Sequence, residues 1–490
     1  MNHMFMRSAL AVALASAFSA NVALADDDFD GFAYKKDFGA MVEHLLHAQS
    51  EKLFGFDQPL QESAPATTGA YRTLEQKAMD QVLVAKGLKV EYLTRNAANS
   101  TDMMAFFPAE KPTHLISCIE GSRAEVVPGK YNPSVQSINL ATGQVETILR
   151  GMSGCDGIRT TPWGTILATE EKTDGGAYEI LNPLNVTNQT VLDRSTGAVT
   201  DPANIVKRTA LPAMAWEGLA VLPSGVVIAG DELRPGTAAA DVDGGAIFKF
   251  VPLTPRTGND KIGNLADSPL AFGSVYAMQV SCVNNKQQIG QGCEIGNAAW
   301  VPVNAATARI DADLNGATGF YRPEDLHQDP MYADAANPEA VRVCWTNTGN
   351  EGAVNYAEVV CGVDNEPLIA DSARRTVVVN RLVEGDADFN SFDNLDFQPK
   401  TGNLYVIEDH SNGDIFACLP DGADRDIKAD GCVKMLSVKD SSAEPTGFIF
   451  SADGSTAYVS IQHSNDTNMP KVDDYGTDDI IKISGFKVKK

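Results

Sequence analysis

Short hydrophobic runs separated by Gly, Pro, Asn and Asp fill most of the chain after Leu88. Apolar runs of about four to eight residues, bounded by such turn residues, are typical of β-strands. The preceding part differs, because residues 38–53 show a helical period that places their apolar side chains near one face. Residues 61–69 are rich in Ser, Pro, Ala and Thr, as a linker is. The pattern predicts a partly helical segment and linker over 26–87 and an all-β domain over 88–490.

Several of the hydrophobic runs repeat one arrangement. A residue able to bind a metal opens a short apolar strand, a Gly-containing turn reverses the chain, a second apolar strand follows, and polar or acidic residues end it. Four clear copies open at Cys155, Glu217, Asp393 and Glu444. Two looser copies open at Asp102 and Glu324. The chain therefore contains six candidate copies of one β-hairpin unit.

The spacing of these openers favours a β-propeller. Blade repeats usually run about 40 to 50 residues, and longer repeats carry loop insertions. The longest interval, from Glu217 to Glu324, fits one blade plus an insertion over 251–301. We expect a six-bladed β-propeller with its openers on the central axis. The alternative, unrelated hairpins with ordinary turns, leaves polar openers of buried strands without partners, which is costly.

The first 25 residues have the order of an export signal. Arg7 precedes an apolar stretch over 9–18, and Ala23-Leu24-Ala25 stands directly before three Asp residues. The stretch is shorter than the roughly 20 residues of a membrane span, and it lacks a twin-Arg pair. We expect cleavage after Ala25, a general secretory route, a periplasmic or extracellular location, and no transmembrane segment.

The chain carries a net charge of −25, which argues against binding to nucleic acid, whose phosphates need a basic surface. Most of these charges are those of a soluble exported protein. An anionic substrate must then be attracted by local cations rather than by the average surface. We expect a monomer that acts on a small molecule.

Eight cysteines in an exported chain indicate disulfides. Proximity suggests three local pairs, although sequence leaves the connectivity open. These pairs are Cys282 with Cys293, Cys344 with Cys361, and Cys418 with Cys432. Two cysteines remain, and either Cys118 and Cys155 are bonded to each other or one of them stays a thiolate for chemistry.

The openers comprise five carboxylates and one thiol, which resist ionisation together in a narrow channel unless cations lie among them. Carboxylate oxygens suit hard cations such as Ca²⁺, whereas a thiolate favours a transition metal, with iron or zinc as first candidates. Acidic residues that close the hairpins either complete a polynuclear site or face solvent. These closing residues are Glu120, Glu171, Asp231, Glu232, Glu408 and Asp409.

Arg322 stands two residues before the opener Glu324. A guanidinium beside a metal cluster is able to bind a phosphate with two hydrogen bonds. The alternative is that Arg322 neutralises Asp325 or another carboxylate, and the local sequence does not decide between the two.

Several of these motifs resemble the PhoX-type alkaline phosphatases over about 102–463. The similar segments are Cys155 with Thr161-Pro162-Trp163-Gly164-Thr165 and Thr169-Glu170-Glu171, Arg322-Pro323-Glu324-Asp325, Asp393-Asn394-Leu395 and Ile461-Gln462-His463. The resemblance implies a six-bladed propeller with a cluster of Fe(III) and Ca²⁺ that hydrolyses phosphate esters outside the cytoplasm. The chain departs from the family at 156–159, where the family usually has Gly-Gly, and at Ala168, where it has a second Cys.

The resemblance also implies roles for individual residues. Cys155 matches a thiolate that bridges iron ions, and Arg322 matches the phosphate-binding arginine, so both are expected in the catalytic centre. Glu217 and Glu324 match carboxylate ligands, with Glu171 as a further one. The remaining expected metal ligands follow from repeat position and are Asp102, Glu120, Asp393 and Glu444.

Two other functions fit the same residues. A calcium-dependent propeller lactonase or esterase shares the carboxylate-lined channel but needs neither Cys155 nor Arg322. A non-catalytic propeller that binds a ligand around a structural Ca²⁺ is the third hypothesis.

Overall fold

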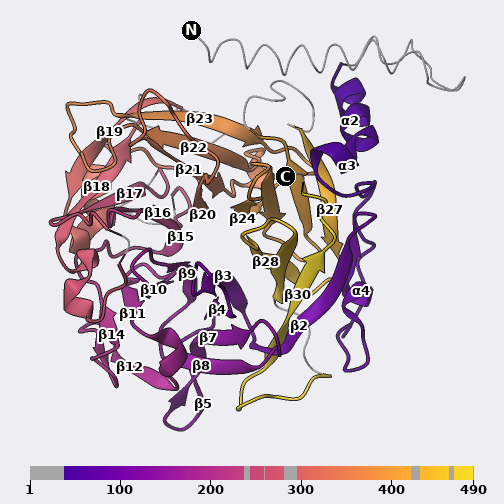
Figure 1. Cartoon of the computed structure of the whole chain (residues 1–490), viewed down its shortest axis with the longest axis horizontal. Helices are drawn as coiled ribbons and strands as arrows, with labels where there is room; N and C mark the ends of the chain where they lie inside the picture. The colour runs from indigo at the N-terminus through magenta and orange to yellow at the C-terminus, as the bar shows by residue number, and fades with distance from the viewer. Residues whose placement is uncertain are drawn as a thin grey trace, which may run out of the picture.

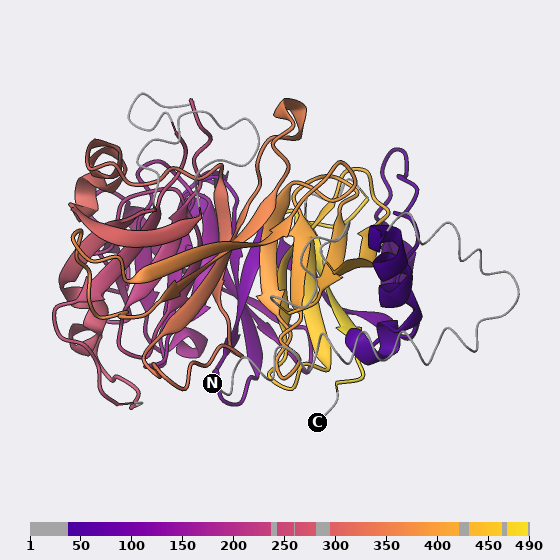
Figure 2. The same ribbon diagram turned by 90° about the horizontal axis from the view of Figure 1, so that it is seen from above.

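The computed structural model describes residues 38–236, 243–258, 260–280, 295–420, 431–462 and 468–488. The expected signal sequence over 1–25 lies outside these residues. The fold is all-β with few helices, and its sheets stand around a centre like the blades of a propeller (Figure 1). Viewed from the side in Figure 2, the sheets stand next to one another in a body that is wider than it is thick.

Each of the first two sheets has its innermost strand at the centre of the ring, and its other strands follow outwards. The first comprises β3 (Thr101–Phe107), β4 (His114–Ile119), β7 (Pro133–Asn139), β8 (Val145–Arg150), β12 (Gln189–Asp193) and β13 (Ala198–Val199). The second comprises β9 (Cys155–Thr160), β10 (Ile166–Glu170), β11 (Ala177–Ile180) and β14 (Ile205–Lys207). A separate hairpin contains β5 (Glu125–Val127) and β6 (Lys130–Tyr131).

The longest sheet has an inner strand at each end. From one end it comprises β15 (Trp216–Val221), β16 (Val227–Asp231), β17 (Ile247–Pro252), β18 (Gly273–Gln279) and β19 (Gly296–Val303). From the other end it comprises β20 (Pro323–Gln328), β21 (Val341–Asn347), β22 (Glu358–Asp364) and β23 (Val377–Glu384), and β23 pairs with β19. The stretch 251–301, expected to be a loop insertion, therefore contributes β18 and much of β19 to the sheet.

The last two sheets each take their outer strand from the N-terminal part of the chain. One comprises β24 (Phe392–Phe397), β25 (Leu404–Glu408), β26 (Asp414–Cys418), β27 (Cys432–Val438) and β1 (Val82–Val84). The other comprises β28 (Glu444–Phe450), β29 (Thr456–Gln462), β30 (Thr477–Ser484) and β2 (Lys89–Ala98). The pairing of β2 with β30 joins the two ends of the chain and closes the ring of sheets.

The helices are short and lie outside the sheets (Figure 1). They are α2 (Phe38–Ala48), α3 (Ser50–Leu53), α4 (Ala78–Gln81), α5 (Ala308–Leu314) and the 3₁₀ turns Pro183–Asn185, Leu265–Asp267, Pro269–Ala271, Ala305–Thr307 and Glu351–Ala353. The stretch 38–53 is thus helical, as its period predicts. The segment between α3 and α4 contains Arg72, whose fully buried side chain forms an ion pair with Asp479 of β30.

The innermost strands contact one another in a closed ring, in the order β3, β9, β15, β20, β24, β28 and back to β3. Hydrophobic side chains fill the spaces between neighbouring sheets. One cluster joins Trp163 and Leu167 of the second sheet to Trp216 and Phe248 of the next. Because this burial removes apolar surface from water, it provides the main force that holds the sheets together.

The turns of the inner hairpins β9–β10 and β15–β16 each place a glycine at a positive φ. Gly164 has a φ of 84° and Gly225 a φ of 93°, a region that side chains with a Cβ adopt only with strain. The backbone N–H of Thr161 donates to Thr165 in the first turn, and that of Leu222 donates to Val226 in the second. The Gly-containing turns predicted for these two copies are therefore the reversals of their hairpins.

Three disulfides lie within the described residues. Cys344–Cys361 and Cys418–Cys432 join neighbouring strands, and both predicted local pairs are confirmed. The predicted pair Cys282–Cys293 lies outside the described residues. The third disulfide joins Cys118 to Cys155 and settles the alternative that the sequence left open. Among the helices that the structure describes, none is long and apolar enough to cross a membrane.

Candidate metal centre

The same backbone irregularity recurs in every inner strand of the ring. In each hairpin, three residues of the inner strand span two residues of its partner, which is a β-bulge. The bulges begin at Thr101, Cys155, Trp216, Pro323, Phe392 and Thr446. The residue that follows is acidic in five of the six strands. These axial residues are Asp102, Asp156, Glu217, Glu324 and Asp393.

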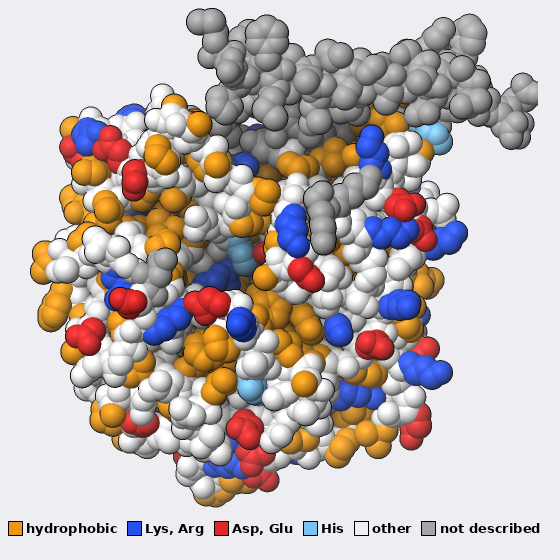
Figure 3. Space-filling model, in the orientation of Figure 1, with side chains coloured by type: hydrophobic (Ala, Val, Ile, Leu, Met, Phe, Trp, Pro, Cys, Tyr) orange, Lys and Arg blue, Asp and Glu red, His pale blue; other side chains and the backbone are white. Residues whose placement is uncertain are grey.

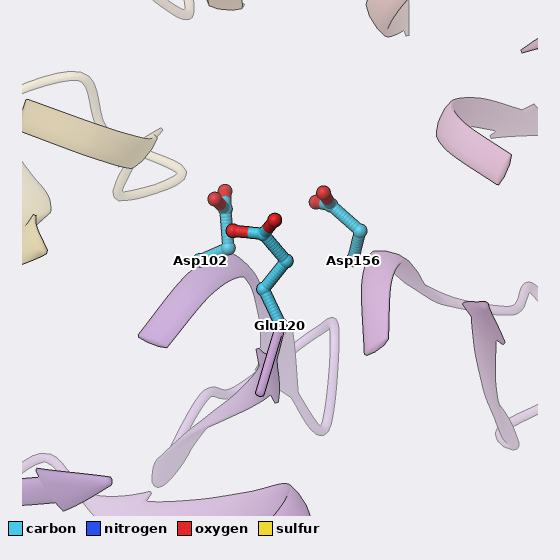
Figure 4. Close-up of side chains that lie close together, drawn as sticks. All are labelled: Asp102, Glu120 and Asp156. Carbon is cyan, nitrogen blue, oxygen red and sulfur yellow. The ribbon is translucent and has the colours of Figure 1, made fainter. Parts of the chain in front are cut away.

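The axial carboxylates approach one another in three overlapping groups. Within each group, one candidate ligand atom per residue lies within 4.8 Å of those of the other members. The groups are Asp102–Glu120–Asp156, Asp156–Glu171–Glu217 and Glu217–Glu324–Asp393. Figure 4 shows the first group, in which the three carboxyl groups point toward one another from two neighbouring sheets. Since Asp156 and Glu217 each belong to two groups, the carboxylates form one continuous row.

Burial makes this row electrostatically costly. It raises the pKa of Asp156 and of Glu217 well above the usual range of a carboxyl group, and neighbouring carboxylates raise both further. Burial and then nearby carboxylates also raise the pKa of Asp393. The pKa of Glu324 is raised by burial although Arg322 opposes the shift. The row is therefore fully ionised near neutral pH only when cations neutralise it.

Asp156 carries the clearest sign of a missing partner. Its side chain is buried, with 4% of the residue exposed, and its Oδ1 has no hydrogen-bond partner in the described structure. An unpaired buried acceptor costs about 1–3 kcal/mol, and such atoms are rare in folded proteins. A cation bound between the carboxylates would satisfy this oxygen, so the residues fit a site for hard cations.

The acidic excess of the protein is not displayed as one surface patch on the face seen in Figure 3. There, acidic, basic and hydrophobic side chains are interspersed. Part of the net charge of −25 is instead gathered in the buried row of carboxylates.

Acidic pairs end three of the inner hairpins, and their two members have different partners. The first members are Glu170, Asp231 and Glu408, and the second members are Glu171, Glu232 and Asp409. Each first member is buried and accepts backbone N–H hydrogen bonds. Their basic partners are Arg194, Arg309 and His410, respectively. The first members therefore stabilise the hairpin ends, and they do not face solvent.

The His410–Glu408 pair makes the stability of the folded protein depend on pH at neutral to alkaline values. Its hydrogen bond to Glu408 raises the pKa of His410 to about 9, compared with about 6.5 for an unperturbed imidazole. The contribution of this pair to stability is therefore fully present below about pH 6.5 and is lost as the pH rises through about 9. We expect the melting temperature of the wild type to fall across this range relative to that of His410→Gln. Thermal melts of both proteins at a series of pH values check this. Melting temperatures that change with pH in the same way for both proteins would contradict it.

The structure contradicts the expectation that Cys155 is a free thiolate. Its sulfur is bonded to that of Cys118, and both residues are fully buried in a hydrophobic cluster between two sheets. The bulge that begins at Cys155 turns Asp156 to the axis and leaves Cys155 among the hydrophobic side chains between the sheets. A sulfur in a disulfide does not ionise, and a thiolate-bridged iron centre does not fit this arrangement.

Glu444 also differs from its expected position. The bulge of β28 begins at Thr446, so the axial place of this strand is occupied by Gly447. Glu444 pairs with Gln462 nearer the start of the strand and belongs to none of the three carboxylate groups found among the described residues. It lies close to Asp409, since burial and then Glu444 raise the pKa of Asp409 to about 6.

Arg322 lies beside the row of carboxylates and binds three of its acidic neighbours. Its Nε is 2.6 Å from Oε1 of Glu232, and its Nη2 is 2.8 Å from Oε1 of Glu324 and 3.2 Å from Oδ2 of Asp409. The structure thus realises the alternative in which Arg322 neutralises carboxylates. Its partners do not include Asp325, which is paired with other basic side chains.

The Thr-Pro-Trp-Gly-Thr run, the most specific part of the resemblance, has a structural role. The Trp163 Nε1 donates to Oε1 of Glu179 at 2.7 Å, and Thr165 Oγ1 donates to the same oxygen. Arg208 neutralises this buried carboxylate. The run therefore fixes the turn of the inner hairpin rather than contributing ligands to the axis.

Of the residues expected at the centre, the structure brings Asp102, Glu120, Glu171, Glu217, Glu324 and Asp393 together and places Arg322 beside them. It adds Asp156, which sequence reasoning passed over. One signal was available: Asp156 and Glu217 both stand eight residues before the Gly of their turn, whereas Cys155 stands nine residues before it.

A sequence model described as alkaline phosphatase PhoX matches residues 140–465. No curated protein matches the chain. Similar solved structures include a glucose dehydrogenase-type oxidoreductase from Thermus thermophilus, with 14% identity, a TM-score of 0.42, and coverage of 81% of this chain and 100% of that one. A gluconolactonase from Xanthomonas campestris has 12% identity, a TM-score of 0.37, and coverage of 87% and 98%. A PQQ-bound aldose sugar dehydrogenase from Streptomyces coelicolor has 11% identity, a TM-score of 0.40, and coverage of 82% and 99%. Such low scores carry no information about the activity of this chain.

Proposed function

Because the chain belongs to the alkaline phosphatase PhoX family, we propose that it is an exported, monomeric phosphatase that hydrolyses phosphate esters at a metal centre on the axis. The observation that carries this proposal is the row of buried carboxylates with the guanidinium of Arg322 beside it. Disulfides support a location outside the cytoplasm, where such bonds persist.

We also propose that the propeller has six blades. The closed ring of inner strands and the bulge shared by all of them support this number. The longest sheet then counts as two blades, β15 to β18 and β20 to β23, which β19 links at their outer edge.

The cations that we propose for the centre are Ca²⁺ and, as a second hard ion, Fe(III) held by oxygen atoms alone. The ligands would be the axial carboxylates with Glu120 and Glu171. When bound, such cations polarise a phosphoryl oxygen and lower the pKa of a bound water molecule. A cation at Glu324 competes with Arg322 for this carboxylate, so the loaded centre leaves the guanidinium freer to bind a phosphate oxygen.

The test is hydrolysis of a chromogenic phosphomonoester by purified protein, with Ca²⁺ and after chelation. We expect turnover that disappears with the chelator. Arg322→Ala is expected to lower kcat by about 100-fold, as the loss of a group that stabilises transition-state charge does. Arg374→Ala is the matched control, because Arg374 forms an exposed ion pair with Glu366 and such pairs contribute little.

One observation favours the calcium-dependent lactonase or esterase as a second candidate. Cys155 is in a disulfide and Arg322 is occupied by carboxylates, so neither is free for the roles that a phosphatase gives them. Cleavage of a lactone with Ca²⁺, together with no cleavage of the phosphomonoester, would establish this alternative. Ca²⁺ binding with neither activity would leave the non-catalytic binding propeller.

A further inference from the structure

We infer that Asp156 bridges two neighbouring hard cations on the axis, in the role that the family resemblance gives to a cysteine thiolate. The inference rests on the metal centre of the proposed function and deepens it. It is tested through cation binding and thiol chemistry, so it is independent of which ester the protein cleaves.

The position of Asp156 is that of a bridge. It is shared by the group with Asp102 and Glu120 and by the group with Glu171 and Glu217. A carboxylate has two oxygens, each able to bind a different cation. The buried Oδ1 of Asp156 has no partner among the described residues, so at least one of its two oxygens is available as a ligand.

The backbone around Asp156 is fixed and does not let Cys155 exchange places with it. The carbonyl of Gly157 accepts a hydrogen bond from Thr169 Oγ1 at 2.9 Å. A Cβ at Gly157 would lie 2.0 Å from the carbonyl oxygen of Glu217, so β9 packs directly on the next inner strand. Turning Cys155 to the axis requires a one-residue slip of β9, which would move every side chain of the strand to the opposite face.

The disulfide lies behind the first carboxylate group and braces it. Cys118 precedes Glu120 by two residues, and Cys155 directly precedes Asp156. The bond therefore ties together the strands that carry two of the three carboxylates in Figure 4. Its sulfur atoms position ligands and do not bind the cations.

Oxygen ligands alone select hard cations, with Ca²⁺ favoured by a large and flexible coordination sphere. We assign one cation to each side of Asp156, the first with Asp102 and Glu120 and the second with Glu171 and Glu217. Because the two cations share one ligand, loss of Asp156 should weaken both at once.

The experiment is titration of chelator-treated protein with Ca²⁺ by calorimetry. Asp156→Asn keeps the size of the side chain and is expected to weaken binding of two Ca²⁺ ions by at least about 10-fold each, or about 1.4 kcal/mol. Glu91→Gln, at an exposed position of β2, is the matched control and should bind as the wild type does. The double variant Cys118→Ala/Cys155→Ala is expected to keep the same number of Ca²⁺ ions.

Two outcomes would overturn the inference. One is Ca²⁺ binding by Asp156→Asn that equals that of the wild type. The other outcome is measured on the wild type. Cys118 and Cys155 would react as free thiols after denaturation in chelator, and the native protein would contain iron and show a visible absorption band from thiolate bound to iron. If Ca²⁺ binds as expected but no phosphomonoester is cleaved, the proposed function fails and this inference stands.

Discussion

Glu217→Gln is expected to raise the melting temperature of the cation-free protein and to abolish most of the phosphatase activity that we propose for it. Glu217 is shared by two carboxylate groups, and burial followed by the neighbouring carboxylates raises its pKa well above the usual range. A neutral amide removes this repulsion, so the cation-free fold gains stability. The same change removes a ligand, so the stabilisation by Ca²⁺ should shrink and turnover should fall by at least about 100-fold.

The measurement is thermal unfolding of both proteins with chelator and with Ca²⁺. Glu179→Gln provides the matched control, because Glu179 is an equally buried glutamate away from the axis. Its carboxylate neutralises Arg208 and accepts hydrogen bonds from two hydroxyl groups. We expect this variant to be less stable under both conditions. If Glu217→Gln also destabilised the cation-free protein, the carboxylate row would be a structural network rather than a cation site.

The repeat was visible in the sequence because its glycine turn residues recur in four of the six hairpins, together with the apolar runs on either side. Gly164 and Gly225 mark reversals whose positive φ only glycine adopts easily. Four of the five axial carboxylates followed from this repeat, since an acidic residue at the start of a buried strand is otherwise costly. The two local disulfides that the structure describes, Cys344–Cys361 and Cys418–Cys432, followed from proximity alone.

The expected and observed positions of Cys155 differ for a physical reason. Successive side chains of a strand point in opposite directions. An alignment error of one residue therefore assigns to the axis a side chain that points into the hydrophobic interior. At Cys155 the axial acidic residue is one place further along. Glu444 is a separate case, because the bulge of its strand begins two residues later, at Thr446, and the axial place is taken by Gly447. The position of a bulge depends on how two strands pair, so it cannot be predicted from the hydrophobic pattern of one strand.

The partners of Arg322 were equally beyond the reach of local sequence. Glu232 and Asp409 come from two other hairpins and are distant from Arg322 along the chain. Only the closure of the ring brings them together. The same holds for the segment over 26–87, which was expected to be partly helical with a linker and which also supplies strand β1 to one of the sheets.

Asp479→Ala is expected to lower the free energy of unfolding by about 3–5 kcal/mol, the cost of leaving a buried charge without its partner. Asp479 lies on β30 and is fully buried, and it binds Arg72 and Arg95 from the N-terminal part of the chain. Burial alone would raise its pKa, but the hydrogen bonds from both arginines outweigh this effect and lower the pKa. The carboxylate therefore remains ionised between two cations, and its removal leaves both of them facing each other.

This loss should be concentrated where the ring closes, because Arg72 and Arg95 hold the N-terminal segment against the last sheet beside the pairing of β2 with β30. Urea unfolding measures the loss, and limited proteolysis should cut the variant first before residue 100. Glu110→Ala is the control, since Glu110 and its partner Lys261 are both exposed and surface pairs contribute about 0–1 kcal/mol. A loss no larger for Asp479→Ala than for this control would mean that the strand pairing closes the ring without help from the buried ion pair.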